Sequence, residues 1–354
     1  MEKAVREIFI ADIKSCNQNG KSPGHYFSVA GNYCDMFDGI HPVKVVGGPV
    51  YADKFSNLFV LKYDDKLYGN KVLRKVKTIL NCFQVFKNIK GHYLVIQSNA
   101  LLCFYIALAL WSKPMNVFMI QYNNESINSG LKRLLYRLCK NRICGVFCCN
   151  EEVGAAYGLP FCVVPDYCVT NKVYGSLQQT VSNKKYDVCM LGLITEDKGV
   201  VQVASKLAGS DARVIIAGKA DNSEIEQRLK EIVQSCNNIT LKLSYISDEE
   251  YDTYFRQSRF CWLNYSDAYS AHSSGVVFDA IYRGTPVIGR NCKTLEFIKE
   301  NELGRVYHDL NSFDFETALA SDECRYLDNI KEFLHKELER PKEIVAFLEK
   351  YRKI

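Results

Sequence analysis

The stretch YDVCMLGLITEDKGVVQVASKL, residues 186–207, decides the fold. It starts with a short apolar run at 186–191, which is typical of a buried strand, and turns at Gly192. Apolar side chains then recur at helical spacing over 200–207, which is typical of a helix with one buried face. A buried strand followed directly by a helix is typical of βαβ units, so this stretch predicts a parallel sheet covered by helices.

The same order returns along the second half of the chain. Short apolar runs separated by helical segments lie at 213–217, 239–245, 260–265, 286–289 and 305–307. The first half repeats the pattern, less regularly, with apolar runs at 8–10, 43–46, 93–97, 117–121 and 146–149. The apolar stretch at 100–111 has 12 residues, whereas a bilayer span needs about 20, so we expect a buried helix there.

Chain length bounds the number of domains. The chain has 354 residues, and a typical domain has about 150. The predicted fold class is therefore α/β, with two Rossmann-like domains that face each other across a cleft. We expect an N-terminal domain at 1–170, a C-terminal domain at 180–320, and helices at 321–354 that pack back toward the N-terminal domain.

Composition excludes several classes of protein. Hydrophobic residues make up 47% of the chain and aromatic residues 12%, which excludes a mainly disordered protein. The cysteines contain no C-x-x-C pair, so neither a zinc ribbon nor a dithiol redox site is indicated. No signal peptide and no cluster of metal ligands stands out. We expect a cytoplasmic protein with reduced thiols and with no metal or other cofactor.

Charge is divided unevenly along the chain. Residues 1–175 carry 21 Lys and Arg against 12 Asp and Glu, a net charge of +9, and residues 176–354 carry 24 against 28, a net charge of −4. Two basic segments, 66–90 and 129–142, combine cations with apolar side chains at helical spacing. Such helices are typical of binding to an anionic membrane surface, and also of core helices with a solvated basic face. Neither segment carries a nucleic-acid reader motif, so we expect no nucleic-acid partner.

Three segments that follow predicted strands carry a candidate binding site for a phosphate-bearing ligand. GLITEDKG at 192–199 offers Gly192 for a tight turn and Lys198 as a point charge for a phosphate. SAHSSGVVFDAIYRG at 270–284 begins a helix whose first N–H groups can bind a phosphate. TPVIGRN at 285–291 carries Arg290 to the same edge of the sheet. Each segment alone fits an ordinary connection between a strand and a helix, but together they favour a nucleotide-diphosphate site.

Within the second segment, Ser273, Ser274 and Gly275 precede the helical pattern and are candidates for a phosphate cradle. Asp279 lies one turn further on, where a carboxylate can accept hydrogen bonds from a ribose diol. His272, next to the cradle, is a candidate catalytic residue, and an ordinary structural histidine is the alternative.

The first half carries a candidate acceptor site. NGKSPGH at 19–25 is a glycine-rich loop that precedes a helical stretch. Gly24 and His25 are candidates for acceptor binding, and His25 is also a candidate for proton transfer. A structural role for this histidine remains the alternative interpretation.

In this order, the segments resemble the retaining glycosyltransferase family 4, whose members have the GT-B fold. The second half resembles its nucleotide-binding domain through GLITEDKG, VIIAG at 214–218, YISDEEYDTYFRQSRFCWLNY at 245–265, SSGVVFDAIYRGTPVIGRN at 273–291 and ENELGRVY at 300–307. The first half resembles its acceptor domain through NGKSPGHYFSVAG at 19–31, NALLCFYIALALWSKPMNVFMIQY at 99–122 and VFCCNEEVGAAYGLPFCVVPDY at 146–167.

The sequence departs from the family pattern at three places. Leu193 stands where the family has an arginine, and Gln121 stands where it has a histidine that faces the acceptor. The paired glutamates of the family fall on Ala271 and Asp279, so the ribose-binding acid is kept and the acid that contacts the donor sugar is not.

The resemblance implies a glycosyltransferase that moves a sugar from a nucleotide-diphosphate-sugar to a hydroxyl of a glycan acceptor, with retention and without a metal. Lys198 and the amides of 273–275 would hold the diphosphate, and Arg290 would supply the missing positive charge. Together with the basic segments, the resemblance favours a lipid-linked acceptor in bacterial surface-polysaccharide or lipopolysaccharide synthesis, at the inner face of the cell membrane. Leu193 and Ala271 keep one alternative open, a catalytically silent scaffold that binds a glycan or a protein partner. A sugar-nucleotide epimerase is a minor alternative, disfavoured because the carboxylates and histidines that it needs are not clustered in the sequence.

Overall fold

The chain divides into two compact units. One consists of Met1–Cys168 with Glu339–Ile354, and the other of Val169–Leu338. The computed structural model describes residues 5–14, 25–63, 69–98, 100–128, 130–164, 169, 174–175, 177, 184–267, 274–320 and 323–354, with backbone alone at 25 and 323. The predicted boundary at 321 falls inside the second unit, and the predicted C-terminal helices are therefore shared between the two units.

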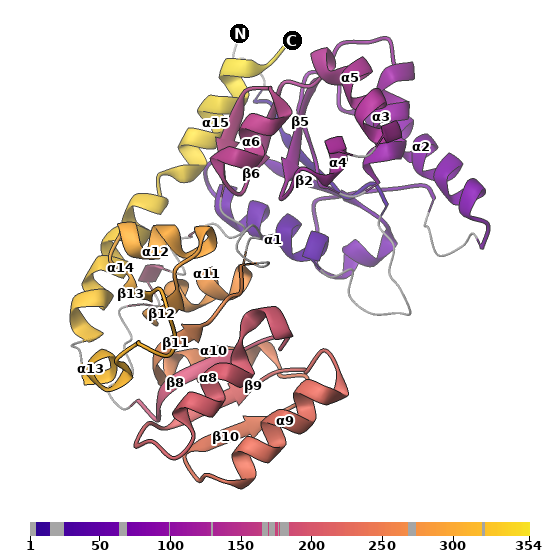
Figure 1. Ribbon diagram of the computed structural model, residues 1–354. Helices are drawn as coiled ribbons and strands as arrows, with labels where there is room; N and C mark the ends of the chain where they lie inside the picture. Colours follow the sequence, from indigo (N-terminus) through magenta and orange to yellow (C-terminus); the bar gives the residue numbers. More distant parts are fainter. Residues whose placement is uncertain are drawn as a thin grey trace. The chain divides into compact units, whose positions relative to one another are not determined.

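The first unit is built on a parallel sheet with the strand order β3-β2-β1-β4-β5-β6-β7 (Figure 1). The strands are β1 (Ile8–Ala11), β2 (Val43–Gly47), β3 (Leu58–Val60), β4 (Tyr93–Ile96), β5 (Asn116–Gln121), β6 (Gly145–Cys148) and β7 (Phe161–Val163). The helices and 3-10 turns are α1 (His25–Phe37), η2 (Pro49–Asp53), α2 (Lys71–Asn88), α3 (Leu101–Leu110), α4 (Glu125–Asn128), α5 (Gly130–Cys139), η4 (Lys140–Arg142), α6 (Glu151–Tyr157) and α15 (Arg340–Tyr351).

Each face of this sheet has its own apolar core, because successive side chains of a strand point to opposite faces. Helices α2, α3, α5 and α6 cover one face, and α1 and α15 cover the other. The predicted apolar helix at 100–111 is confirmed as α3, whose buried residues include Phe104 and Leu108. None of the helices in the described ranges has the length and apolarity that a bilayer span requires.

Helix α15 belongs to the core of the first unit although it is the last helix of the chain. Its residues Ile344 and Leu348 are fully buried, and Phe347 packs on Phe118 of β5 and Phe147 of β6. The Asn116 side chain accepts hydrogen bonds from the backbone N–H groups of residues 353 and 354 at 2.8 and 3.0 Å. One apolar core of the first unit is therefore completed by residues that lie beyond the second unit in the sequence.

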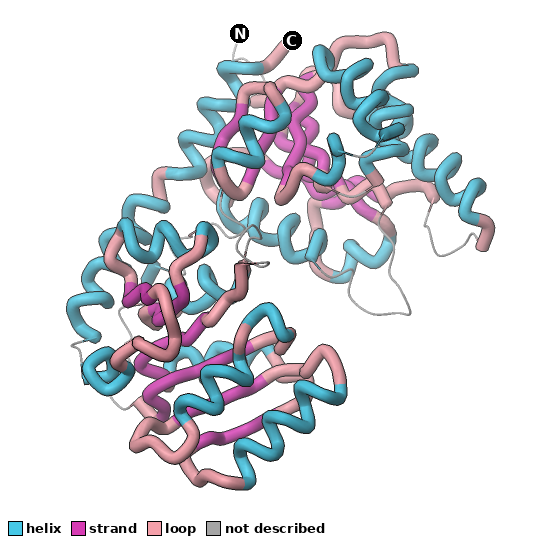
Figure 2. Tube along the Cα trace, in the orientation of Figure 1, coloured by secondary structure: helices cyan, strands magenta, loops and turns pink. Residues whose placement is uncertain are grey.

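The second unit repeats the architecture with a parallel sheet of order β10-β9-β8-β11-β12-β13, whose strands are labelled in Figure 1. Figure 2 draws strands in magenta and helices in cyan. Its strands are β8 (Tyr186–Leu191), β9 (Val214–Ala217), β10 (Ile239–Lys242), β11 (Ser258–Leu263), β12 (Val287–Arg290) and β13 (Gly304–Tyr307). Its helices and 3-10 turns are η5 (Glu196–Lys198), α8 (Val200–Leu207), α9 (Ser223–Gln234), α10 (Asp248–Arg256), α11 (Gly275–Tyr282), η6 (Lys293–Leu295), α12 (Glu296–Glu300), α13 (Phe315–Ala320) and α14 (Glu323–Glu337). Helices α8 and α9 pack on one face of the sheet, where Trp262 is the largest buried side chain.

The order of the strands determines where ligands fit. In the first unit, neighbours in sequence run outward from β1 in one direction and from β4 in the other, so the order reverses between β1 and β4. In the second unit the same reversal lies between β8 and β11. At such a switch point the connections leave toward opposite faces, and a crevice opens at the carboxyl ends of the strands. The α/β prediction is confirmed, and it places one candidate crevice in each unit.

Candidate functional site

The loops that follow β8 and β9 approach each other so closely that only glycine fits. Gly192 has φ +94°, in the left-handed region that favours glycine, and its N–H donates to the carbonyl of Ala217 at 3.0 Å. Gly218 follows β9 with φ +147°, and a Cβ there would stand 1.8 Å from the carbonyl oxygen of Gly192. The predicted sharp turn at Gly192 is present, and it follows β8 directly at the switch point.

Lys198 lies at the end of η5, on the β8 side of the switch point. Burial lowers the pKa of its ammonium, and the thiol of Cys261 on the neighbouring strand β11 partly opposes this effect. No carboxylate among the described residues forms an ion pair with Lys198. A partly desolvated cation without a counter-charge gains stability when an anion binds beside it. Lys198 therefore has the electrostatic setting of a phosphate ligand.

Helix α11 begins on the other side of the switch point, after β11. Ser274 occupies the N-cap position, but its side chain makes no capping hydrogen bond and instead bonds the hydroxyl of Tyr265. The first N–H groups of α11, from Gly275 onward, therefore have no side-chain cap from Ser274. Free N–H groups at the positive end of a helix dipole are a ready anion site. The phosphate cradle at the start of α11 stays a prediction, because Ser273 lies outside the described residues.

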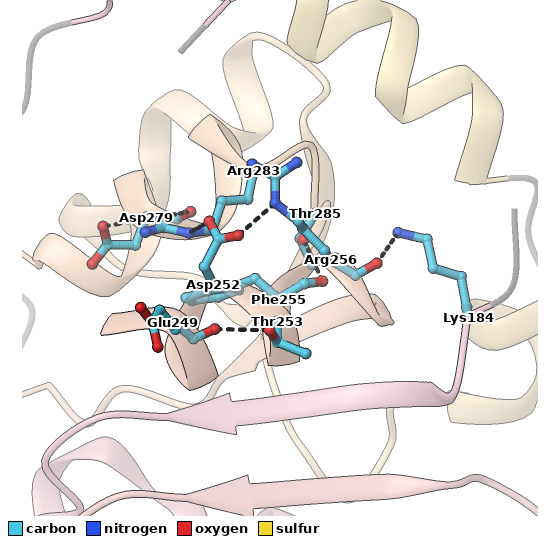
Figure 3. A network of polar contacts seen from close by, with 9 residues as sticks. All are labelled: Lys184, Glu249, Asp252, Thr253, Phe255, Arg256, Asp279, Arg283 and Thr285. Atoms are coloured by element: carbon cyan, nitrogen blue, oxygen red, sulfur yellow. Dashed lines mark hydrogen bonds and ion pairs between the residues drawn. The ribbon is translucent and has the colours of Figure 1, made fainter. Parts of the chain in front are cut away.

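Asp279 projects from α11 and contacts two neighbouring side chains, of which Figure 3 shows Arg283. The Oη atom of Tyr251 donates to Oδ2 at 3.0 Å, and Nη1 of Arg283 donates to Oδ1 at 3.1 Å. Burial raises the pKa of the Asp279 carboxyl, while the charge of Arg283 and the hydrogen bonds oppose the rise. Each carboxylate oxygen keeps a further lone pair, so Asp279 can still accept hydrogen bonds from a diol.

The network continues into α10, which positions Tyr251. Nε of Arg283 donates to Asp252 at 3.0 Å, and Asp252 also accepts from Arg256 at 2.6 Å (Figure 3). Helix α10 starts at a capping box in which Ser247 and Glu250 satisfy each other's backbone groups. Burial and the adjacent Asp279 raise the pKa of the Tyr251 hydroxyl well above its usual range, so Tyr251 stays a donor at neutral pH.

A pocket of about 360 Å³ opens beside this network at the carboxyl ends of β8, β9 and β10. Its lining residues are Gly192, Leu193, Gly218, Lys219, Ser244, Tyr245, Ile246, Asp248 and Tyr251. Tyr251 borders the pocket and hydrogen-bonds Asp279, so a ligand in the pocket is one side chain away from the carboxylate. Tyr245 at its edge is 84% exposed, which leaves its ring available for stacking.

Arg290 lies in a different pocket from the one next to Asp279. It lines a pocket of about 650 Å³ together with Asn264, Ser266 and His308. Its guanidinium forms an ion pair with Asp267 at 3.1 Å and donates to the carbonyl of Tyr265. The structure therefore gives Arg290 a partner of its own and does not bring it together with Asp279.

In the first unit, Gln121 ends β5 as a fully buried side chain. Its Oε1 accepts from Tyr157 at 2.8 Å and from Ser126 at 3.2 Å, whereas its Nε2 has no partner among the described residues. Gln97, which follows the neighbouring strand β4, donates to the carbonyl of Tyr26 and keeps an unpartnered Oε1. Both side chains are only 1% exposed, so each unpartnered atom lies in the interior of the first unit.

The remaining predicted residues, Gly24, His272 and Ser273, lie outside the described ranges, and so does the His25 side chain. Sequence reasoning missed Tyr251, Arg283 and Gln97. The i,i+4 spacing of Asp279 and Arg283 was a usable signal for an ion pair on one helix face. Tyr251 gave no signal, because it is 28 positions from Asp279 and reaches it through the packing of two helices.

No protein-family model matches the sequence, and no curated protein sequence matches it. Solved structures match the fold over nearly the whole chain. AviGT4, a glycosyltransferase involved in avilamycin A biosynthesis, matches with a TM-score of 0.62 and 13% identity over 98% of this chain and 96% of its own. OtsA, a trehalose-6-phosphate synthase, matches with a TM-score of 0.69 and 10% identity over 97% and 99%. An E. coli structure described as trehalose-6-phosphate bound with UDP-2-fluoro glucose matches with 0.66 and 9% over 99% of both chains. The chain therefore has the GT-B fold.

Proposed function

We propose that this chain is a glycosyltransferase that transfers a sugar from a nucleotide-diphosphate-sugar to a hydroxyl group of an acceptor. The observation that carries the proposal is the β8/β11 switch point, where Lys198 follows β8 and the start of α11, with Asp279 further along the helix, follows β11. The charges of Lys198 and Asp279 both act on the thiol of Cys261 on β11, which supports a shared site for the cation and the carboxylate.

The donor fits this site group by group. The diphosphate binds Lys198 and the first N–H groups of α11, and the ribose diol donates to Asp279. The base lies in the neighbouring pocket, where Tyr245 stacks on it. As the glycosidic bond to the diphosphate breaks, negative charge grows on the leaving group. Lys198 and the α11 dipole stabilise that charge, which is how we infer that the reaction proceeds without a metal.

The acceptor hydroxyl is assigned to the first unit. Gln121, at the end of β5, is the side chain that we assign to the acceptor from its place in the sequence. Retention of configuration follows from the resemblance to family 4 and is part of the proposal. Loss of the family's sugar-contacting acid at Ala271 means that other side chains hold the donor sugar in this chain.

We further propose that the acceptor is lipid-linked, as in bacterial surface-polysaccharide synthesis, and that the first unit binds an anionic membrane. The leucines of α5 support this proposal, because Leu131, Leu134 and Leu138 are 60%, 55% and 66% exposed rather than packed in the core. Helix α2 likewise exposes Val72 and Val76 among its cations. Exposed apolar side chains interleaved with Lys and Arg favour binding to an anionic bilayer.

The proposal is tested by incubating the chain with a panel of nucleotide-sugars and measuring the free nucleoside diphosphate, with and without lipid-linked acceptors. We expect release with one donor and an increase when the correct acceptor is added. A thermal-shift screen of the same panel identifies the donor independently, because a ligand that binds the folded state raises its apparent stability. Donor binding without any release would favour the catalytically silent scaffold, and the absence of both would contradict the proposal.

A further inference from the structure

The first unit has a pocket at its own switch point. The pocket measures about 430 Å³ and lies where the chain leaves β1 and β4. Lys14 lines it from the β1 side, and Ser98 and Ala100 line it from the β4 side. The N-terminal parts of three helices line it, with Lys71, Arg74, Lys75 and Thr78 from α2, Leu101, Leu102 and Cys103 from α3, and Lys132 from α5. Figure 1 shows α2, α3 and α5 side by side in this unit.

The charge of this pocket has one sign. Five of its lining residues, Lys14, Lys71, Arg74, Lys75 and Lys132, are cationic, and no Asp or Glu is among the described residues that line it. They come from three separate segments of the sequence, so the cluster is made by the fold and not by one basic run. Cations gathered in a concave site focus a positive potential that attracts anionic ligands.

The cations stand at the unfavourable ends of their helices. The N-terminus of a helix carries a partial positive charge, which is why acidic side chains normally occupy the first turn. This chain follows that rule in α6, α9 and α10, each of which has two or three acids in its first turn. In contrast, α2, α3 and α5 have no acid there, and α2 and α5 have Lys71 and Lys132 instead. An anion in the pocket relieves this repulsion, and departures from local rules of this kind concentrate at functional sites.

Helix α3 adds backbone donors to the same pocket. It begins after Ala100, which has φ +49° in the left-handed region that alanine rarely adopts, and no side chain caps it. Ala100 and Leu101 both line the pocket, so the start of α3, the positive end of its dipole, lies beside the cations. The apolar side chains of Leu101 and Leu102 form part of the wall.

We propose that this pocket binds the phosphate or diphosphate group of the acceptor substrate. The inference rests on the proposed function, and it adds that the acceptor is anionic and is held by its phosphate in the first unit. Five cations with backbone and hydroxyl donors form strong, charge-assisted hydrogen bonds to phosphate oxygens. A lipid-linked sugar diphosphate and a soluble sugar phosphate present the same group, so both sources are included in the test.

The experiment measures equilibrium binding of farnesyl diphosphate, glucose 6-phosphate and inorganic pyrophosphate to the full chain. The test variant, K71E/K132E, reverses two pocket charges. The control variant, K87E/R137E, makes the same change in charge at the last turns of the same two helices, outside the pocket. All titrations are repeated with K198A, which removes the proposed phosphate ligand of the second unit and leaves the pocket unchanged.

We expect binding to weaken about tenfold or more in K71E/K132E and to change less than about twofold in K87E/R137E. The test variant also acquires acids in two first turns, so its melting temperature without ligand rises by about 2 °C. A loss of binding in a more stable protein is not a folding defect. Preference for farnesyl diphosphate supports a lipid-linked source, and preference for glucose 6-phosphate supports a soluble one.

Equal binding by the test variant and the unmodified chain, or no binding of any of the three probes, would overturn the inference. The donor screen separates this result from failure of the proposed function. If nucleotide-sugars bind and are turned over at the same rate in K71E/K132E, the proposed glycosyltransferase activity is supported and the phosphate pocket is contradicted. If no nucleotide-sugar binds while K71E/K132E still binds farnesyl diphosphate more weakly than the unmodified chain, the pocket is supported and the proposed activity is contradicted.

Discussion

The hydroxyl of Tyr251 donates to the carboxylate of Asp279 across 3.0 Å and thereby joins helices α10 and α11 at the edge of the donor pocket. Arg283 holds the other carboxylate oxygen and at the same time lies over the Tyr251 ring, 5.5 Å from its centroid. The carboxylate is therefore fixed from two sides before any ligand arrives. Such preorganisation reduces the entropy that binding would otherwise lose.

Replacement of Asp279 by Ala should weaken binding of the donor about tenfold to a hundredfold, because hydrogen bonds to charged groups contribute about 1.5–3 kcal/mol. Isothermal titration with the nucleotide-sugar found in the screen measures the loss. H308A is the matched control, since His308 lines the other pocket of the second unit and should leave affinity unchanged. Equal effects of the two variants would contradict the assignment of Asp279.

Replacement of Lys198 by Ala should lower kcat about a hundredfold or more, with a smaller change in KM, because Lys198 acts mainly on the charge of the departing diphosphate. K198R should restore part of the rate. Steady-state release of nucleoside diphosphate measures both. K206A serves as the control, as the Lys206 ammonium donates to the carbonyl of Asn311 and lies on α8 away from α11. A loss confined to KM would show that Lys198 binds the donor without stabilising the leaving group.

The leucines exposed on α5 should determine membrane binding. Simultaneous replacement of Leu131, Leu134 and Leu138 by Ser should reduce partitioning onto anionic vesicles at least about tenfold, since burying one leucine contributes about 1.5–3 kcal/mol. Co-sedimentation with anionic and with neutral vesicles measures the effect. I40S is the control, because Ile40 is a comparably exposed apolar residue away from α2 and α5. Unchanged sedimentation of the triple variant would contradict the proposed binding of the first unit to an anionic membrane.

The acid stability of the second unit should depend on Asp187. Although burial favours its protonated form, hydrogen bonds and charge from Arg213, with the charge of Arg259, lower the pKa of this carboxyl below its ordinary value of 3.8. A carboxyl whose pKa is depressed by folding stabilises the protein above its unfolded pKa, and this contribution is lost as pH falls through the folded pKa. D187N should therefore destabilise the protein at pH 7 by about 1–3 kcal/mol.

The difference between D187N and the unmodified protein should shrink as the pH falls below about 3.8, where the unfolded state binds the proton first, and should be lost below the lower pKa of the folded state. Urea denaturation across pH 3 to 7 measures it. D211N is the control, because Asp211 is an exposed carboxylate two residues before Arg213. A difference that stays constant with pH would show that Asp187 acts through packing rather than through its charge.

Much of the fold could be predicted because buried parallel strands carry a strong local pattern. The runs at 186–191 and 117–121 correspond to β8 and β5 within one residue, and the helix at 100–111 is α3. Strands β3 and β7 were missed because each has three residues and lies at an edge of the sheet, where few side chains are buried. Their pairing is set by the neighbouring strand and not by their own composition.

The candidate site was predictable where chemistry follows strand order, and unpredictable where it depends on packing. Lys198 and Asp279 could be selected because each follows a strand at the switch point. The capping role of Ser274 could not be judged from sequence, because the Tyr265 hydroxyl competes for its side chain. The ion pair of Arg290 with Asp267 likewise forms between two loops, and the basic pocket of the first unit collects cations that are more than a hundred residues apart.

The position of α15 in the first unit has a consequence for synthesis on the ribosome. Phe118 and Phe147 await the aromatic side chain of Phe347, which emerges only after the whole second unit has been translated. At about 5–20 residues per second, the interval from residue 164 to residue 339 lasts roughly ten to thirty seconds. During that time the nascent first unit exposes an uncovered aromatic face. Chaperones that recognise such faces can therefore bind it before translation ends and not after α15 has packed on it.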